Sequence, residues 1–310
     1  MTGGAGFIGS HLTKMLLDTG WHVVVLDDFS SGKIENFDEW SDSSAIRIVR
    51  GDIRDRKIVD EVLDGIDSVV HLAAFVNPPE SIKKPLETHD VNLNGTLNVL
   101  ESCLRNRIKK LVFASSAAVY GDGNPLPLRE GCCLRPISPY AASKASAEFY
   151  CKMYRDCYGL GSVILRFFNV YGPGQNTGEY AGVITRFVAS GLQGKPLTIY
   201  GDGSQTRDFV NVKDVVSAVE KALSFESADT EVFNVCTGKP VSINELARFV
   251  CETLGKNLEV KHAESRPGDI IYNYGDPTKA QHVLGFETHV NFKDGLEQFI
   301  KSLDYRSYNG

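Results

Sequence analysis

Short apolar runs alternate with amphipathic stretches through the first half of the chain. The runs are rich in Val, Ile and Leu, as buried strands are, and the stretches between them carry apolar residues at helical spacing. This alternation predicts a parallel sheet with helices on both faces. The expected strands are residues 21–26, 46–49, 68–72, 110–114 and 162–167, and the expected helices include 57–63, 91–103 and 140–158.

The alternation breaks after residue 168. Turn residues and short elements leave the sheet, a strand–helix–strand segment returns to it, and helices at 243–254 and 292–303 follow. We therefore predict an α/β chain: a Rossmann-type doubly wound parallel sheet with a smaller C-terminal α/β substrate lobe. The expected division assigns 1–168 and a return segment of about 206–240 to the domain of the parallel sheet, and 169–205 and 241–310 to the smaller lobe.

Three glycines mark the entry to the first amphipathic helix. Gly3, Gly6 and Gly9 have the spacing that allows a tight turn, close approach of a pyrophosphate and close packing of helix on sheet. The helix N-terminus would offer free amides and the positive end of its dipole to phosphates. Only Met1 and Thr2 precede the glycines in this sequence, so the first strand is expected to be truncated or unusually short.

An acidic pair, Asp27-Asp28, ends the second apolar run about 20 residues after the glycines. A carboxylate at this place holds the hydroxyls of an adenosine ribose, and its charge repels a 2′-phosphate. The pattern therefore predicts NAD rather than NADP as cofactor.

Composition excludes several classes of partner. The chain has 310 residues, 42% of them hydrophobic, and a net charge of −6, which argues against nucleic acid or an anionic membrane as partner. No apolar run approaches the roughly 18–20 residues of a membrane span, and no signal peptide precedes the glycines, so the expected compartment is the cytoplasm. The seven cysteines form no C-x-x-C pair or metal-ligand spacing and are expected to be reduced thiols, with no metal bound.

Candidate chemistry follows the 110–114 strand. Ser116 lies at its carboxyl end, and Tyr140 and Lys144 lie four residues apart on a helix, which places them on one face. A neighbouring ammonium would lower the pKa of the phenol, so Tyr140 could remove a hydroxyl proton near neutral pH, while Ser116 holds the same substrate oxygen. A Tyr–Lys pair of this spacing alone is more often a surface pair; its place after the glycine turn and the acidic strand end favours the catalytic interpretation.

These residues together resemble the extended short-chain dehydrogenase/reductase family, most closely its nucleotide-sugar epimerases of the UDP-glucose 4-epimerase type. The resemblance covers nearly the whole chain and rests on motifs in a fixed order. They are TGGAGFIGSH at 2–11, HLAA at 71–74, FASSAAVYG at 113–121, YAASK at 140–144, RFFNVYGPGQ at 166–175, GDGSQTRDFV at 201–210, NVCTG at 234–238 and RPGD at 266–269.

The resemblance implies a role for further residues. On the cofactor side it implies that Asp52 contacts the adenine and that Lys144 also binds the nicotinamide ribose. The remaining cofactor positions implied are Phe7, Ile8, Ile53, Leu72, Ala73, Ala74, Asn92 and Tyr140. On the substrate side it implies that Asn169, Arg207 and Arg266 reach the pyrophosphate and that Asp269 reaches the ribose of a UDP-sugar; guanidinium groups suit that charge.

The resemblance also narrows the reaction. In related 4,6-dehydratases and decarboxylases, acidic residues follow the serine position, whereas this chain has Ala117 and Ala118, which cannot move protons. This favours 4-epimerisation of a UDP-hexose through a transient 4-keto sugar. The alternatives are another nucleotide-sugar enzyme, acting on a UDP-uronic acid or a dTDP-sugar, and a non-catalytic NAD-binding protein.

Two further expectations follow from the resemblance. The position seven residues after the RPGD arginine guards C2 of the sugar, and a small residue there admits N-acetyl sugars; here it is Asn273. The helices near 91–104 and 140–158 carry more apolar residues than one sheet face needs, and in the family two such helices from each subunit form the interface, so a homodimer is expected.

Overall fold

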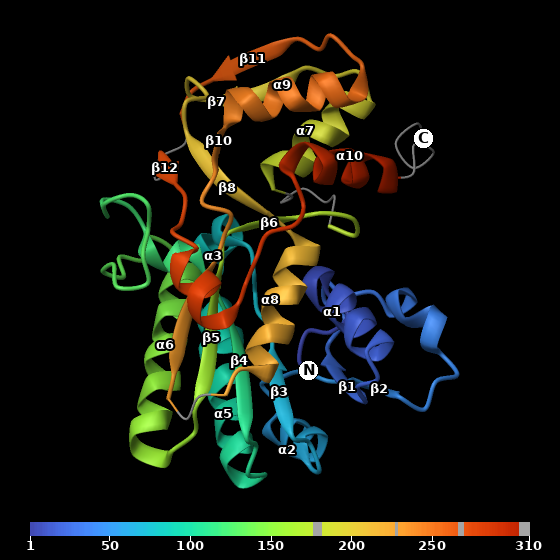
Figure 1. Cartoon of the computed structure of the whole chain (residues 1–310), viewed down its shortest axis with the longest axis vertical. Coiled ribbons are helices and arrows are strands. Elements are labelled where there is room, and N and C mark those ends of the chain that lie inside the picture. Colours follow the sequence, from blue (N-terminus) through green and yellow to red (C-terminus); the bar gives the residue numbers. More distant parts are fainter. Residues whose placement is uncertain (176–181, 227–228, 266–269, 304–310) are drawn as a thin grey trace.

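One parallel sheet forms the larger part of the molecule (Figure 1). The computed structural model describes residues 1–175, 182–226, 229–265 and 270–303. All neighbouring strands of this sheet are parallel, which confirms the predicted doubly wound α/β fold. Their order across the sheet is β2 (Ile46–Arg50), β1 (Val23–Asp27), Thr2, β3 (Ser68–His71), β4 (Lys110–Ser116), β5 (Ser162–Phe167) and β9 (Glu231–Val235).

The strand before the glycines is reduced to a single bridging residue. Thr2 pairs with Leu26 on one side and His71 on the other, and it joins the β1–β2 pair to the remaining strands. The Thr2 nitrogen donates to the Val70 oxygen at 3.0 Å, and the Thr2 oxygen accepts from the Leu72 nitrogen at 3.1 Å. The segment is short, as the sequence predicted. The centre of the sheet nevertheless keeps its backbone pairing through Thr2.

Helices cover both faces because side chains alternate along each strand. The first core joins α1 (Phe7–Asp18) and α8 (Val212–Ser224) to one set of strand residues, and the second joins α2 (Arg56–Leu63), α5 (Gly95–Arg105) and α6 (Pro139–Tyr158) to the other. Adjacent strand residues divide accordingly: Val112 belongs to the first core and Phe113 to the second. This alternation explains why the strands read as continuous apolar runs.

Short helical elements connect β3 to α5, although the segment contains three prolines, Pro78, Pro79 and Pro85. They are two short helices, α3 (Pro78–Lys83) and α4 (Pro85–His89), and a π-helical turn, Asp90–Asn94, that joins α4 to α5. A proline opens each short helix, where its missing N–H costs nothing and its fixed φ suits the first turn. The Asn77 side chain caps α3 by accepting from the Glu80 nitrogen at 2.9 Å. The prolines therefore start helices here rather than prevent them.

A smaller lobe lies above the carboxyl ends of the sheet strands in Figure 1. Its main strand β8 (Thr206–Asn211) pairs with β6 (Asn169–Tyr171), β10 (Pro240–Ser242) and β12 (Tyr272–Asn273). A third core holds the lobe's helices and strands together. Its other elements are α7 (Val183–Leu192), β7 (Leu197–Tyr200), α9 (Ile243–Leu254), β11 (Val260–Ala263) and α10 (Phe292–Ser302). Within the described residues, none of the helices has both the length and the apolar character needed to cross a bilayer.

Candidate active site

The glycine turn has the geometry of a phosphate cradle. A methyl group on Gly3 (φ +69°) would lie 2.6 Å from the Ala73 nitrogen, and one on Gly9 would lie 2.2 Å from the Gly3 oxygen, so neither position admits a side chain. A methyl group on Gly6 would meet only the Gly3 oxygen, at 3.4 Å. Gly6 is also the N-cap of α1 without a side-chain cap, so the first amides of the helix, at Phe7 and Ile8, remain available to an anion.

The acidic pair divides into an inner and an outer carboxylate. Asp27 is buried, and its oxygens accept from the Ala5 and Phe29 nitrogens, both at 2.9 Å. The bond from Ala5 fixes the glycine turn against the end of β1. Burial raises the pKa of this carboxyl. Asp28 is exposed and accepts from the Ser30 nitrogen and hydroxyl. A cavity of about 500 Å³ opens next to this loop, lined by Phe29, Gly32, Lys33, Ile34, Glu35, Ile48 and Arg50.

The other cofactor positions follow the carboxyl ends of β2 and β3, except Asn92, which lies in the π-helical turn before α5. Two of these positions have protein partners. The Asp52 carboxylate forms an ion pair with Arg54, whose hydrogen bonds lower the pKa of Asp52. Asn92 is buried; its oxygen accepts from the Phe75 nitrogen at 2.6 Å, and its nitrogen donates to the Ser143 hydroxyl at 3.0 Å. Asn92 thus fixes the 73–75 loop against α6. The remaining positions are Ile53, which is buried, and Leu72, Ala73 and Ala74, which are partly exposed.

Strand β4 and helix α6 bring the three expected catalytic residues together. Ser116 ends β4, and Tyr140 and Lys144 lie in the first two turns of α6, both buried. The Lys144 ammonium donates to the Ala114 oxygen at 2.8 Å and lies 4.9 Å from the centre of the Phe113 ring. Burial lowers the pKa of Lys144 to about 8.

The expected effect of Lys144 on the phenol is wrong for this structure. Burial raises the pKa of Tyr140, and the group that opposes this is Ser116, through a hydrogen bond to the phenol. Desolvation disfavours the phenolate because the ring lies in the interior, an effect that spacing along a helix does not reveal. The neighbouring group that favours ionisation of the Tyr140 phenol is therefore Ser116 rather than Lys144.

Three of the expected substrate residues lie on adjacent strands of the smaller lobe. Asn169 in β6 and Asn273 in β12 flank β8, and Asn273 is in register with Arg207. The Arg207 guanidinium donates to the Thr206 and Ile270 oxygens at 2.8 and 2.7 Å, and the Asn169 amide donates to the Asp208 oxygen at 3.2 Å. Asn273 is buried, and its Oδ1 has no hydrogen-bond partner among the described residues. Arg266 and Asp269 lie outside the described residues.

The sequence analysis did not single out His71, although it lies in the HLAA motif. Its ring is buried between two hydroxyls: Nδ1 lies 2.6 Å from the Thr2 Oγ1, and Nε2 lies 3.0 Å from the Thr96 Oγ1. Burial is the main cause that lowers the pKa of His71, to about 3, so the ring is neutral near pH 7. The sequence could have pointed to His71, because it ends β3 and directly precedes Leu72, one of the expected cofactor positions.

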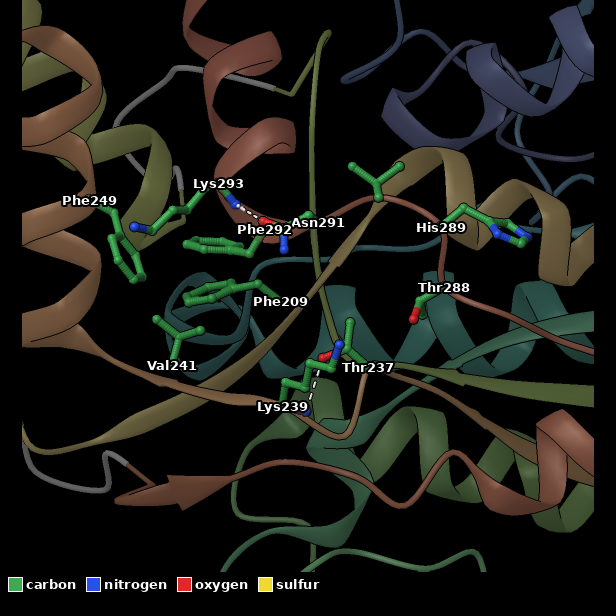
Figure 2. Close-up of a pocket in the computed structure, with 11 residues that line it drawn as sticks. Phe209, Thr237, Lys239, Val241, Phe249, Thr288, His289, Asn291, Phe292 and Lys293 are labelled. Carbon is green, nitrogen blue, oxygen red and sulfur yellow. Dashed lines mark hydrogen bonds between the residues drawn. The ribbon is translucent and has the colours of Figure 1, made fainter.

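A second cavity, of about 430 Å³, lies in the smaller lobe between β8, β10 and the start of α10 (Figure 2). The Phe209 and Phe292 rings stack in it at 5.2 Å, and Lys239 and Lys293 also line it. It contains none of the expected site residues. Within the described part of the chain, no three His, Cys, Asp or Glu side chains are grouped as a metal site requires.

The chain is similar to known proteins over nearly its whole length. The family described as GDP-mannose 4,6 dehydratase matches residues 1–299. A putative UDP-glucose 4-epimerase of Methanocaldococcus jannaschii is 37% identical over 302 residues, covering 97% of this chain and 96% of its own.

Two solved structures have nearly the same fold. The UDP-glucose 4-epimerase of Thermus thermophilus, in complex with NAD, has a TM-score of 0.88 and 38% identity, covering 98% of this chain and 97% of its own. A UDP-N-acetylglucosamine 4-epimerase of Methanobrevibacter ruminantium, in complex with UDP-N-acetylmuramic acid, has a TM-score of 0.92 and 38% identity, with coverages of 97% and 96%.

Proposed function

The chain belongs to the GDP-mannose 4,6-dehydratase-type family of extended short-chain dehydrogenases/reductases, the NAD-dependent enzymes that modify nucleotide sugars, and we propose that it is a 4-epimerase of UDP-hexoses. One observation carries the proposal. Ser116 ends β4 and is the neighbouring group that favours ionisation of the Tyr140 phenol, and the two residues after Ser116 are Ala117 and Ala118. Ser116 and Tyr140 can together remove and return one hydroxyl proton, and no second acid or base follows Ser116 to start elimination or decarboxylation.

The residues present fit NAD. The open side of Gly6 and the first amides of α1 suit its pyrophosphate, and the exposed Asp28 beside the 500 Å³ cavity suits the adenosine end. When bound, NAD supplies hydride chemistry, with its nicotinamide as acceptor and then donor. We assign the inner carboxylate, Asp27, to shaping the turn, since both its oxygens already accept from backbone amides.

The protein's own side chains would move the proton of the sugar 4-hydroxyl and orient the sugar and the cofactor. Ser116 would hold the sugar 4-oxygen, and the ionised form of Tyr140, which Ser116 favours, would accept the hydroxyl proton as the C4–H bond breaks, leaving a 4-keto sugar. After the keto sugar has rotated to present the opposite face of C4, Tyr140 would return the proton to the 4-oxygen as the C–H bond re-forms, so Tyr140 ends the cycle ionised, as it began. Lys144, fixed by its hydrogen bond to the Ala114 oxygen, would hold the nicotinamide ribose.

The substrate's nucleotide is assigned to the smaller lobe, residues 169–205 and 241–310 together with β8 at the centre of its sheet. Arg207 and Asn169 lie on adjacent strands and supply donors for a pyrophosphate, and the assignment includes Arg266 and Asp269. The buried, unpartnered Oδ1 of Asn273 supports a polar contact at C2 of the sugar, where the N–H of an acetamide would be its donor. We therefore propose that the enzyme accepts UDP-N-acetylhexoses as well as UDP-glucose and UDP-galactose.

The enzyme is also proposed to be a cytoplasmic homodimer. Phe149 and Tyr158 on α6 are 59% and 58% exposed in the single chain, which a second copy of α5 and α6 would cover.

Incubation of the purified protein with UDP-galactose, followed by chromatography for UDP-glucose, tests the reaction. Formation of UDP-glucose without net change in NAD is expected. A UDP-uronic acid and a dTDP-sugar as substrates test the two alternative assignments within the family. Turnover of either of these, with UDP-galactose unchanged, would refute the proposed substrate; tight binding of NAD without turnover of any sugar would indicate a binding protein.

A further inference from the structure

A row of buried polar side chains crosses the sheet directly beneath the candidate active site. Ser115 in β4 is in register with Arg166 in β5, and Arg166 is in register with Asn234 in β9. All three are at most 3% exposed. Residues in register on neighbouring strands point to the same face, so they form one layer. Since Ser115 immediately precedes Ser116, this layer lies one residue below the strand end that carries the reacting serine.

Helix α6 joins this row through a buried carboxylate. Glu148 accepts from the Ser115 hydroxyl at 2.5 Å, and it accepts from the Arg166 Nε and Nη2 at 2.9 and 2.6 Å. Its side chain is fully buried, and the two nitrogens form a fork on the two carboxylate oxygens. Glu148 lies four residues after Lys144 and eight after Tyr140, hence on the same face of the helix. Glu148 therefore connects the helix of Tyr140 to β4, the strand of Ser116, through the Ser115 hydroxyl, and to β5 through the fork with Arg166.

The network continues toward the smaller lobe. Arg166 Nη1 donates to the Tyr120 hydroxyl at 2.8 Å, and that hydroxyl donates to Asn234 Oδ1 at 2.6 Å. The Asn234 amide nitrogen donates to the Leu128 oxygen at 2.9 Å, and the Leu128 nitrogen donates to the Tyr274 oxygen at 3.0 Å. Tyr274 directly follows Asn273, so one hydrogen-bonded chain runs from the catalytic helix to the segment assigned to the sugar.

Stability alone does not account for such a pair. Removing two charges from water is costly, and apolar residues of similar volume in place of a buried ion pair often give equal or greater stability. The fork instead fixes the relative orientation of α6 and β5, because the five donors of a planar guanidinium can bind a carboxylate in only a few geometries.

We propose that Glu148, Arg166 and Ser115 are positioning residues, which fix the Ser116 hydroxyl relative to the Tyr140 phenol because Glu148 joins α6 to β4 at Ser115 and to β5 at Arg166. This inference rests on the proposed function, because it takes Ser116 and Tyr140 as the reacting pair. The residues touch neither substrate nor cofactor; they act through the backbone of Ser116 and the face of α6. Misplacement of a reacting group by about 1 Å can lower the rate about 10²-fold.

The Ser115→Ala variant tests the first link, with Ser162→Ala as its matched control. Ser162 is also buried in the same sheet, and its hydroxyl lies 3.3 Å from that of Thr230, at the opposite end of β5. Ser115→Ala should lower kcat at least about tenfold with KM for the UDP-sugar within about twofold, whereas Ser162→Ala should keep the kcat of the wild type. Equal kcat values for the two variants, at equal melting temperatures, would overturn the inference.

The double variant Glu148→Leu/Arg166→Met tests the fork without leaving a charge unpaired. It should keep a melting temperature near that of the wild type and lose about 10²-fold in kcat. Unchanged kcat in a folded double variant would overturn the positioning role. If the double variant does not fold, the serine comparison decides the question.

Deuterium exchange separates this inference from the proposed function. A wild type that is inactive on every UDP-sugar would refute the function, yet the hydrogen bond from Ser115 to Glu148 would still hold β4 against α6. The amides of residues 114–118 should then exchange faster in Ser115→Ala than in Ser162→Ala. Equal exchange in these two variants would refute the positioning role on its own.

Discussion

Replacing Lys144 by methionine should stabilise the cofactor-free protein at pH 7 while it abolishes turnover. Lys144 is 3% exposed, and burial is the main cause that lowers its pKa from 10.5 to about 8. The unfolded chain therefore binds more protons than the folded one between about pH 8 and 10.5, so this group makes stability rise with pH across that window. Below pH 8 the ammonium is charged in both states, and the cost of burying it is fully present.

The size of the effect follows from the two pKa values. A difference of about 2.5 corresponds to about 3 kcal/mol of unfolding free energy, at roughly 1.4 kcal/mol for each pH unit. The variant also loses the hydrogen bond to the Ala114 oxygen, worth about 1 kcal/mol. Lys144→Met should thus be more stable than the wild type by about 2 kcal/mol at pH 7, and this advantage should disappear or reverse by about pH 10.

Urea unfolding of the NAD-free protein measures this difference, because bound NAD would add its own stabilisation. Wild type and variant are compared at each pH, so the titration of other groups cancels. The control is Lys109→Met, whose side chain is 83% exposed in the wild type and which should show no comparable dependence on pH. A Lys144→Met variant that is less stable than the wild type at pH 7, or a difference that does not change between pH 7 and 10, would refute the reasoning.

Three further outcomes are expected. Tyr140→Phe should keep binding of NAD and UDP but lower kcat by roughly 10²–10⁴-fold, and more than about a tenth of the wild-type rate would exclude it as the base. Asn273→Tyr should abolish turnover of the UDP-N-acetylhexoses through steric overlap and spare UDP-galactose, as product chromatography on both substrates would reveal. Light scattering should give twice the 34.1 kDa monomer mass, and Phe149→Glu should reduce it to the monomer; a wild-type monomer at micromolar concentration excludes the dimer.

Local pattern predicted most of the sheet because its strands are buried on both faces. Such strands are continuous apolar runs, and the sequence located β1 to β5 to within two residues at each end. The short strands of the smaller lobe were harder. β10 and β12 have three and two residues, which is too short for a periodic pattern in the sequence. They form strands because they pair with β8 in the folded protein.

The candidate site divides in the same way. Spacing along the chain was enough to bring together the glycine turn, Ser116, Tyr140 and Lys144, since strand ends meet at one edge of a parallel sheet and residues four apart share a helix face. The roles of Glu148 and Arg166 could not be deduced in this way. They lie on different elements, and only the register of β4 with β5 and the packing of α6 bring them into contact.

The sequence by itself determined the fold class and the residue types at the reacting edge, because both depend on local spacing and on alternation of apolar and polar positions. Only the tertiary structure decided the protonation of those residues and their partners. Burial raises the pKa of Tyr140 and lowers that of Lys144, and Arg54 occupies the carboxylate of Asp52. Desolvation and pairing depend on every element packed around a group, so they are properties of the assembled interior rather than of any one segment.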